Sequence, residues 1–106
     1  MVRGDVYWIK LKRPDKPRPA LIITRNSAIR SLTSITVIPI TTAMRDNAST
    51  VWLDESDGMP KPCVINVDHI QTVSKDKFGT YLTHLEVPKM NEVFDAVKFA
   101  FGFEEE

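Results

Sequence analysis

A basic cluster around Arg18 is the part of this sequence best suited to chemistry. Pro19 follows Arg18 and favours an extended backbone at the residue before it, so we expect Arg18 where a strand begins. The loop before it adds three more cations, Lys12, Arg13 and Lys16. Such a cluster could face a polyanion. The alternative is a set of ordinary solvated side chains that pair with acids elsewhere in the chain.

Thr41 is the second candidate, because it ends the apolar, β-branched run over residues 35–41. Pro39 cannot donate a ladder hydrogen bond, which predicts a strand edge or a bulge at this point. Such places often display a side chain toward a ligand. The alternative is that a residue with high β propensity simply ends a strand.

The charge is unevenly distributed along the 106 residues, although the net charge is zero. Residues 1–45 hold nine Lys/Arg and two Asp/Glu, a net charge of +7. Residues 46–106 hold five Lys/Arg and twelve Asp/Glu, a net charge of −7. The total argues against a strongly basic nucleic-acid-binding protein, but the first half alone could bind a polyanion.

Several other kinds of site and location are not expected. Cys63, His69 and His84 lack the spacing of metal ligands, and the four glycines are too scattered for a phosphate-binding loop. A single cysteine excludes an internal disulfide. The beginning of the chain lacks the apolar segment of a signal peptide, and no apolar run is long enough to span a membrane. We therefore expect a cytoplasmic protein without a metal or cofactor.

The elements that must position Arg18 and Thr41 are short strands. Apolar alternation and β-branched runs predict strands over residues 5–11, 20–24, 35–41, 50–53, 63–67 and 81–85. Residues 26–32 are expected to form a loop or a short helical turn. A helix is predicted from Pro88 to Gly102, with apolar residues on one face.

This order of elements predicts a mainly β fold with some α structure, in one domain over residues 1–106. Its sheet should be a small barrel or a strongly bent antiparallel sheet, with the C-terminal helix packed on it. A core this small also favours association into a dimer.

Five segments in order resemble the MazF/PemK group of toxin endoribonucleases. They are RGDVYW at 3–8, RPALII at 18–23, VIPIT at 37–41, VINVDHIQTV at 64–73 and THL at 83–85, followed by the final helix. The resemblance spans nearly the whole chain. It implies an SH3-like β-barrel, a homodimer and the cleavage of single-stranded RNA.

The resemblance also implies a reaction. The ribose 2′-OH attacks the adjacent phosphorus and leaves a 2′,3′-cyclic phosphate and a 5′-OH, without a metal. By position, Arg18 would neutralise the phosphorane or serve as the acid, and the permanent charge of a guanidinium favours the first role. Thr41 would hydrogen-bond the scissile phosphate or the 2′-OH, or orient Arg18.

The loop at residues 12–17 departs from the family pattern. It is shorter than the glycine-rich loop that covers the RNA groove in many members. Whether Lys12, Arg13 and Lys16 replace those RNA contacts is left open by the sequence.

The segment that resembles the family at 64–73 departs from it as well. His69 and Gln71 stand where the family often has Gln and Arg, and Asn66 stands where one branch has an Arg before the Asp matched by Asp68. Asp68 and His69 are therefore both candidates for the general base, and both are also candidate RNA contacts. Asn66 and Gln71 are further candidate RNA contacts, and Trp52 is a candidate for base stacking.

A toxin of this group would be neutralised by a cognate antitoxin. We expect its acidic, disordered tail to compete with RNA for the basic groove. A different possibility is a gyrase poison of the CcdB type, because residues 99–103 faintly resemble the end of that group. An inactive binding module on the same fold is a third.

Overall fold

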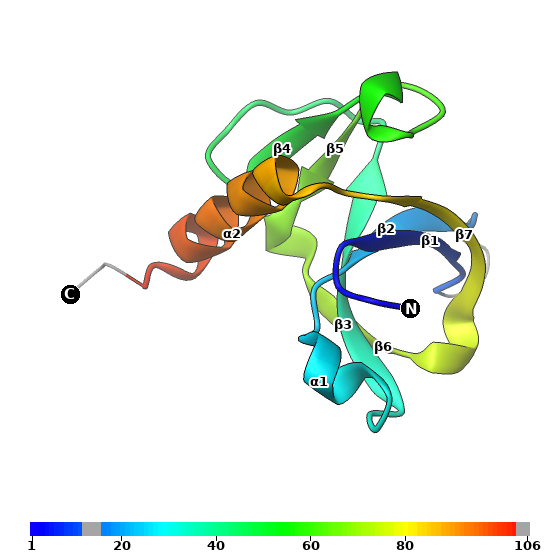
Figure 1. Ribbon diagram of the computed structural model, residues 1–106. Helices are drawn as coiled ribbons and strands as arrows, with labels where there is room; N and C mark the ends of the chain where they lie inside the picture. Colours follow the sequence, from blue (N-terminus) through cyan, green and yellow to red (C-terminus); the bar gives the residue numbers. More distant parts are fainter. Residues whose placement is uncertain (12–15, 104–106) are drawn as a thin grey trace.

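Seven antiparallel strands form one bent sheet in the computed structural model, which describes residues 1–11 and 16–103 (Figure 1). The strands are β1 (Asp5–Ile9), β2 (Arg18–Ile22), β3 (Ser34–Thr41), β4 (Thr50–Leu53), β5 (Cys63–Asn66), β6 (Gln71–Ser74) and β7 (Phe78–His84). Their order is β4-β5-β3-β2-β1-β7, and β6 also pairs with β3. No pairing between described residues joins β6 to β7, so the predicted β fold is confirmed as an open, bent sheet.

Two helices and three 3-10 turns complete the secondary structure of the described residues. These are α1 (Asn26–Ile29), η1 (Glu55–Asp57), η2 (Val67–His69), η3 (Lys75–Lys77) and α2 (Val87–Phe101). Pro88 lies in the first turn of α2, where its missing N–H needs no partner. Gly102 ends the helix with a left-handed backbone, at a φ of 65°. The C-terminal helix is therefore confirmed close to its predicted bounds.

β3 is a central strand that changes partner along its length. One side pairs with β2, and the other pairs first with β6 and then, from Ile40, with β5. Pro39 therefore does not lie at a sheet edge, and of the two predicted alternatives, an edge or a bulge, the edge was wrong. It pairs with Ala20 of β2 and lies where β6 gives way to β5, so its missing donor falls at an interruption of the ladder.

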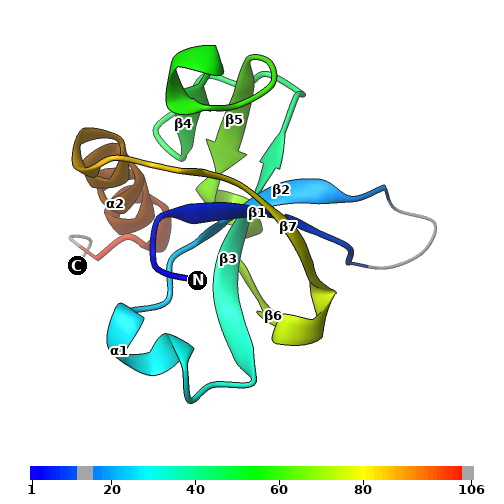
Figure 2. The same ribbon diagram turned by 45° about the vertical axis from the view of Figure 1, so that its right-hand side comes forward.

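Alternation along the strands builds a core on each side of the sheet. One side packs Val6, Leu21 and Ile38 with Val93 of α2, which covers the β4–β5 end of the sheet (Figure 2). The opposite side gathers Ile9, Ala20, Ile22, Ile35 and Val37 within the curve of the sheet. The bend is thus filled from both faces.

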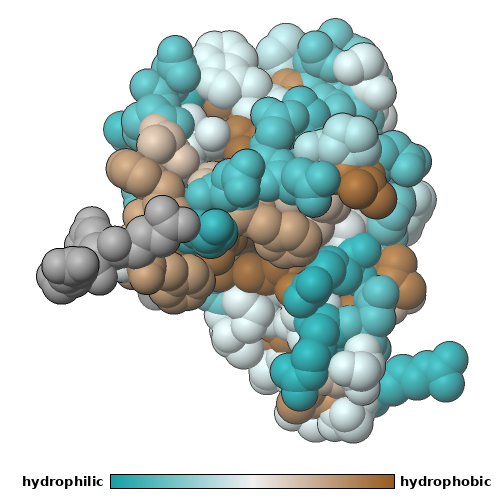
Figure 3. Space-filling view, turned by 60° about the vertical axis from the view of Figure 1, so that its left-hand side comes forward, coloured by the Kyte–Doolittle hydropathy of each residue, from teal (hydrophilic) through white to brown (hydrophobic). Residues whose placement is uncertain are grey.

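The C-terminal part of α2 and the residues just after it carry exposed aromatic side chains. Phe99, Phe101 and Phe103 are all exposed, and apolar surface gathers in this region (Figure 3). No helix of the described residues has the length and apolar character needed to cross a membrane.

Candidate active site

Arg18 and Thr41 come together at one end of the sheet. Arg18 is the first residue of β2, and Thr41 is the last residue of β3. The antiparallel register ends at the pair of Ala20 with Pro39, and Arg18 and Thr41 each lie two residues beyond that pair, at the same end of the two strands. Both residues line the same cleft. Two residues that are 23 positions apart in sequence therefore come to one site.

A cleft of about 560 Å³ lies at this end of the sheet. Its volume falls in the usual range for ligand sites, roughly 300–1,000 Å³. Both Arg18 and Thr41 line it, with the half-buried Trp8 and the buried Met59 and Cys63. The other lining residues are Lys16, Pro17, Pro19, Ile40, Thr42, Ala43, Pro60 and Lys61. The cleft thus combines an apolar floor with a polar rim.

The charges on the rim are all positive in the part of the cleft that the structure describes. Lys16, Arg18 and Lys61 supply three cations, and no Asp or Glu is among these lining residues. A concave site lined by charges of one sign raises the local concentration of oppositely charged ligands. The cleft is therefore suited to an anionic ligand with an apolar portion, as a nucleotide is.

The hydroxyl of Thr41 is held in a defined orientation. Its Oγ1 accepts a hydrogen bond from the backbone N–H of Ala43 at 3.1 Å. Because that bond uses a lone pair of the oxygen, the O–H hydrogen can be donated to a ligand. The side chain of the exposed Arg18 makes no hydrogen bond or ion pair with a described residue, so its guanidinium can bind an anion in bidentate fashion.

Cys63 on the floor of the cleft is unsuited to nucleophilic attack. Burial, and after it the nearby carboxylates, chiefly Asp57, together raise the pKa of its thiol to about 11. The thiol is therefore neutral at neutral pH, whereas the reactive form is the thiolate. It contributes apolar surface and no charge.

The four site residues predicted in the 64–73 segment lie outside the lining of this cleft. Asp68 and His69 are exposed on η2, which joins β5 to β6. The buried Asn66 caps this turn, because its Oδ1 accepts the N–H of Asp68 at 3.0 Å. Gln71 donates from Nε2 to the carbonyl of His69 at 3.4 Å. Asn66 therefore stabilises the start of η2, whether or not it also contacts RNA.

Trp52 stands on the same side of the sheet as Thr41. It pairs with Val64, and Val64 pairs with Thr41, so the three side chains form one row across β4, β5 and β3. Two strand spacings place Trp52 about 10 Å from Thr41. Its side chain is exposed, as base stacking requires.

Of the basic residues predicted in the loop before Arg18, only Lys16 can be placed. It lines the cleft. Lys12 and Arg13 lie outside the described residues.

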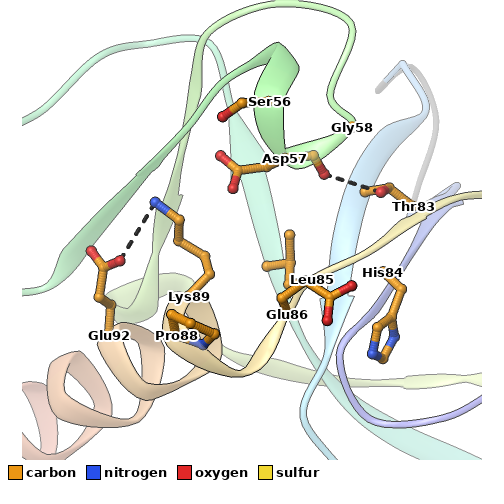
Figure 4. A pocket seen from close by; sticks show the side chains of 10 residues that line it. All are labelled: Ser56, Asp57, Gly58, Thr83, His84, Leu85, Glu86, Pro88, Lys89 and Glu92. Carbon is orange, nitrogen blue, oxygen red and sulfur yellow. Dashed lines mark hydrogen bonds and ion pairs between the residues drawn. The ribbon is translucent and has the colours of Figure 1, made fainter.

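A second cavity, of about 420 Å³, has the opposite character (Figure 4). It lies between η1, the end of β7 and the start of α2, and its acidic residues are Asp57, Glu86 and Glu92. Its lysine, Lys89, is engaged with Glu92 at 3.5 Å and with the carbonyl of Trp52 at 3.0 Å. This cavity is not suited to a phosphate.

His84 borders the second cavity and has a structural partner. Its Nδ1 lies 2.8 Å from Oδ1 of the buried Asp5, whose other oxygen accepts the N–H of Val2. This pair joins the start of the chain to the end of β7. No three His, Cys, Asp or Glu residues of the described ranges come together as metal ligands would.

The sequence interpretation missed Lys61 and Met59, which reach the cleft from the linker between β4 and β5. A shared pattern could have pointed to Lys61. Each of the three cations of the cleft is followed directly by a proline, in Lys16-Pro17, Arg18-Pro19 and Lys61-Pro62.

Known proteins similar to this chain agree in their class. Residues 2–101 match the family model described as "PemK-like, MazF-like toxin of type II toxin-antitoxin system". Endoribonuclease MazF3 of Mycobacterium tuberculosis is 33% identical, with 91% of this chain and 93% of the relative covered. Probable endoribonuclease MazF5 of the same species is 31% identical, with 92% and 90% covered.

Solved structures of this class share the fold. Mycobacterium tuberculosis toxin MazF-mt6 superimposes with a TM-score of 0.85 at 33% identity, covering 92% of this chain and 96% of the other. A mycobacterial endoribonuclease solved in complex with its cognate antitoxin gives 0.86 at 29% identity, covering 96% and 95%. These similarities favour a nuclease over a gyrase poison.

Proposed function

The chain belongs to the PemK-like, MazF-like toxin family of type II toxin–antitoxin systems, and we propose that it cuts single-stranded RNA without a metal ion. The observation that carries this proposal is the cleft that joins Arg18 to Thr41 among three cations. The class of activity, endoribonuclease, is the one that the similar proteins have in their names.

In the proposed reaction, the ribose 2′-oxygen attacks the adjacent phosphorus. The O2′–P bond forms as the P–O5′ bond breaks, which leaves a 2′,3′-cyclic phosphate and a 5′-hydroxyl. A base takes the proton of the 2′-hydroxyl, and the leaving 5′-oxygen gains a proton. No hydrolytic water is consumed in this step.

Arg18 and Thr41 have separate parts in this reaction. The guanidinium of Arg18 neutralises the charge that develops on the phosphorane oxygens, and its permanent charge suits it to this role better than to proton transfer. The hydroxyl of Thr41 donates to a phosphate oxygen, because Ala43 already occupies one of its lone pairs. Asp68 and His69 are the two candidates that the sequence offers for the base, and both lie on η2, outside the lining of the cleft.

We also propose the partners of the toxin. These are a second copy of the chain, as a homodimer, and a cognate antitoxin whose acidic tail competes with RNA for the cationic cleft. The charge of +7 in residues 1–45 and the solved complex of a similar endoribonuclease with its antitoxin support this. The proposed site of action is the cytoplasm, where messenger RNA is found.

The test is the incubation of purified protein with a long single-stranded RNA in EDTA. We expect cleavage with 2′,3′-cyclic phosphate ends, lost in Arg18→Ala and retained in Arg25→Ala. Arg25 is a matched control, because it is also exposed and lies outside the cleft. Intact RNA at high protein concentration, together with stalled gyrase–DNA complexes, would refute the proposal.

The same assay assigns the base. Asp68→Asn and His69→Gln are compared over a range of pH, and the base is the residue whose replacement removes the pH dependence of cleavage.

A further inference from the structure

Lys61 reaches the cleft from the linker that leads into β5, whereas Arg18 reaches it from β2. Lys61 lies two residues before Cys63, the first residue of β5, and β5 pairs with the end of β3. Since the strand order is β5-β3-β2, Thr41 of β3 lies between the linker that carries Lys61 and the strand that carries Arg18. Strand spacing puts the two flanking strands about 10 Å apart.

Lys61 is free to bind a ligand. It is exposed, it lines the cleft, and it makes no hydrogen bond or ion pair with a described residue. The lysine of the acidic cavity, Lys89, differs in both respects, since it is held by Glu92 and by a backbone carbonyl. Lys61 is thus a cation of the acidic half of the sequence that the fold brings to the basic cleft.

Two prolines restrict the backbone around Lys61. Pro60 precedes it and Pro62 follows it, and a following proline keeps a residue in the extended region. Arg18 is restricted in the same way by Pro19. Less backbone freedom in the free protein means less entropy lost when a ligand is bound. The cleft therefore presents two restricted cations and one hydroxyl.

We propose that Lys61 binds a second phosphate of the RNA, next to the scissile phosphate held by Arg18 and Thr41. Arg18 and Lys61 both line the cleft, and none of its described lining residues is acidic, so one RNA strand that enters the cleft can bring a phosphate to each cation. Lys61 is then a positioning residue, because it grips the strand without touching the reacting atoms. This inference rests on the proposed function.

The test measures binding of an uncleavable 2′-O-methyl oligonucleotide that carries the cleaved sequence. Lys61→Met is compared with Lys77→Met, which removes a lysine that is also exposed but lies on η3, outside the cleft. Each phosphate neutralised on a single strand adds about 0.7 to the salt slope. We expect Lys61→Met to lower that slope by about 0.7 and to weaken binding about five-fold near 0.1 M salt, whereas Lys77→Met changes neither.

A scan of neutral methylphosphonates identifies the phosphate. In the wild type, one substitution next to the cleavage site should weaken binding, and Lys61→Met should abolish the effect of that substitution alone. Cleavage by Lys61→Met should show a raised KM and an unchanged kcat. Pro62→Ala keeps the charge of Lys61 but gives its backbone more freedom. It should therefore weaken oligonucleotide binding about two- to five-fold, and the loss should come from the phosphate that Lys61 contacts.

Each remaining outcome counts against the inference. A salt slope for RNA binding that is unchanged in Lys61→Met overturns the inference. It does so even if Lys61 proves to bind an acidic peptide. Equal weakening at every phosphate overturns the assigned position, and unchanged binding in Pro62→Ala overturns the part given to the proline. If the wild type cleaves RNA and Lys61→Met has the same oligonucleotide affinity and salt slope as Lys77→Met, this inference alone is refuted. A wild type that neither cleaves nor binds RNA refutes the proposed function.

Discussion

Replacing Thr41 with valine separates the chemical role of its hydroxyl from its structural role. Valine keeps the shape and the β propensity of threonine but removes the oxygen. The structural loss is one hydrogen bond, from the N–H of Ala43 at 3.1 Å. Ala43 is exposed, so its N–H regains water in the variant and the cost falls at the low end of the usual range, about 0.5 kcal/mol.

The expected loss of activity is much larger than this loss of stability. Removing one donor that stabilises charge in the transition state costs about 100- to 1,000-fold in kcat, or roughly 2.7–4 kcal/mol. An unfolding free energy lowered by about 0.5 kcal/mol moves the Tm by only a few degrees for a domain of this size. The folded fraction at the assay temperature is then unchanged, so the activity lost reports chemistry.

The assay pairs single-turnover cleavage with thermal unfolding, and it uses Thr36→Val as the control. Thr36 lies in the same strand, and its Oγ1 is 2.8 Å from that of Thr72 across the sheet. Its replacement therefore also removes a hydroxyl hydrogen bond from β3, away from the cleft. We expect Thr36→Val to cleave normally and Thr41→Ser to retain most activity. Normal cleavage by Thr41→Val, or equal losses in Thr41→Ser and Thr41→Val, would refute the reasoning.

Two further predictions concern the walls of the cavities. Gly58→Ala should lower the unfolding free energy by roughly 2–4 kcal/mol in a denaturant titration, because its φ is 89° and a Cβ would overlap the hydroxyl of Thr83. Gly79→Ala, whose Cβ would meet only the carbonyl of Trp8 at 3.4 Å, should be nearly neutral, and equal losses in both would contradict this account. Cys63 should react slowly with a disulfide reagent at pH 7.5 and faster as the pH approaches its pKa of about 11, since burial favours the neutral thiol. Unfolded protein, where the thiol has its ordinary pKa, should react at once, and equally fast labelling of the folded protein would show that the thiol is not protected.

The strands that position Arg18 and Thr41 could be predicted from local sequence, because each is an apolar, β-branched run. β6 could not, since Gln71–Ser74 is short and mostly polar and is a strand only because β3 offers it a partner. The edge alternative for Pro39 failed for the same reason. The local rule that assigns proline to an edge cannot foresee a central strand whose partners change beside it.

Within the site, the neighbourhood of Arg18 and Thr41 follows from the register of β2 and β3, whereas the floor of the cleft does not. Met59 and Lys61 arrive from the linker between β4 and β5, about 40 residues after Arg18, and only the bend of the sheet brings them there. Asp68 and His69 show the reverse case, in which a sequence signal pointed to residues that do not reach the cleft. Their place in a family motif pointed to the site, but the 3-10 turn η2 carries them outside the cleft lining.

The fold sorts the uneven charge of the sequence into two separate cavities. The basic first half supplies Lys16 and Arg18 to the cleft, and the acidic second half supplies Asp57, Glu86 and Glu92 to the other cavity. A protein without net charge can thereby keep a local positive potential strong enough to attract a polyanion. Lys61 is the exception to this division, because it belongs to the acidic half and reaches the basic cleft. A cation that crosses the division in this way, next to a proline that restricts it, is better explained by contact with a ligand than by the general solubility of the surface.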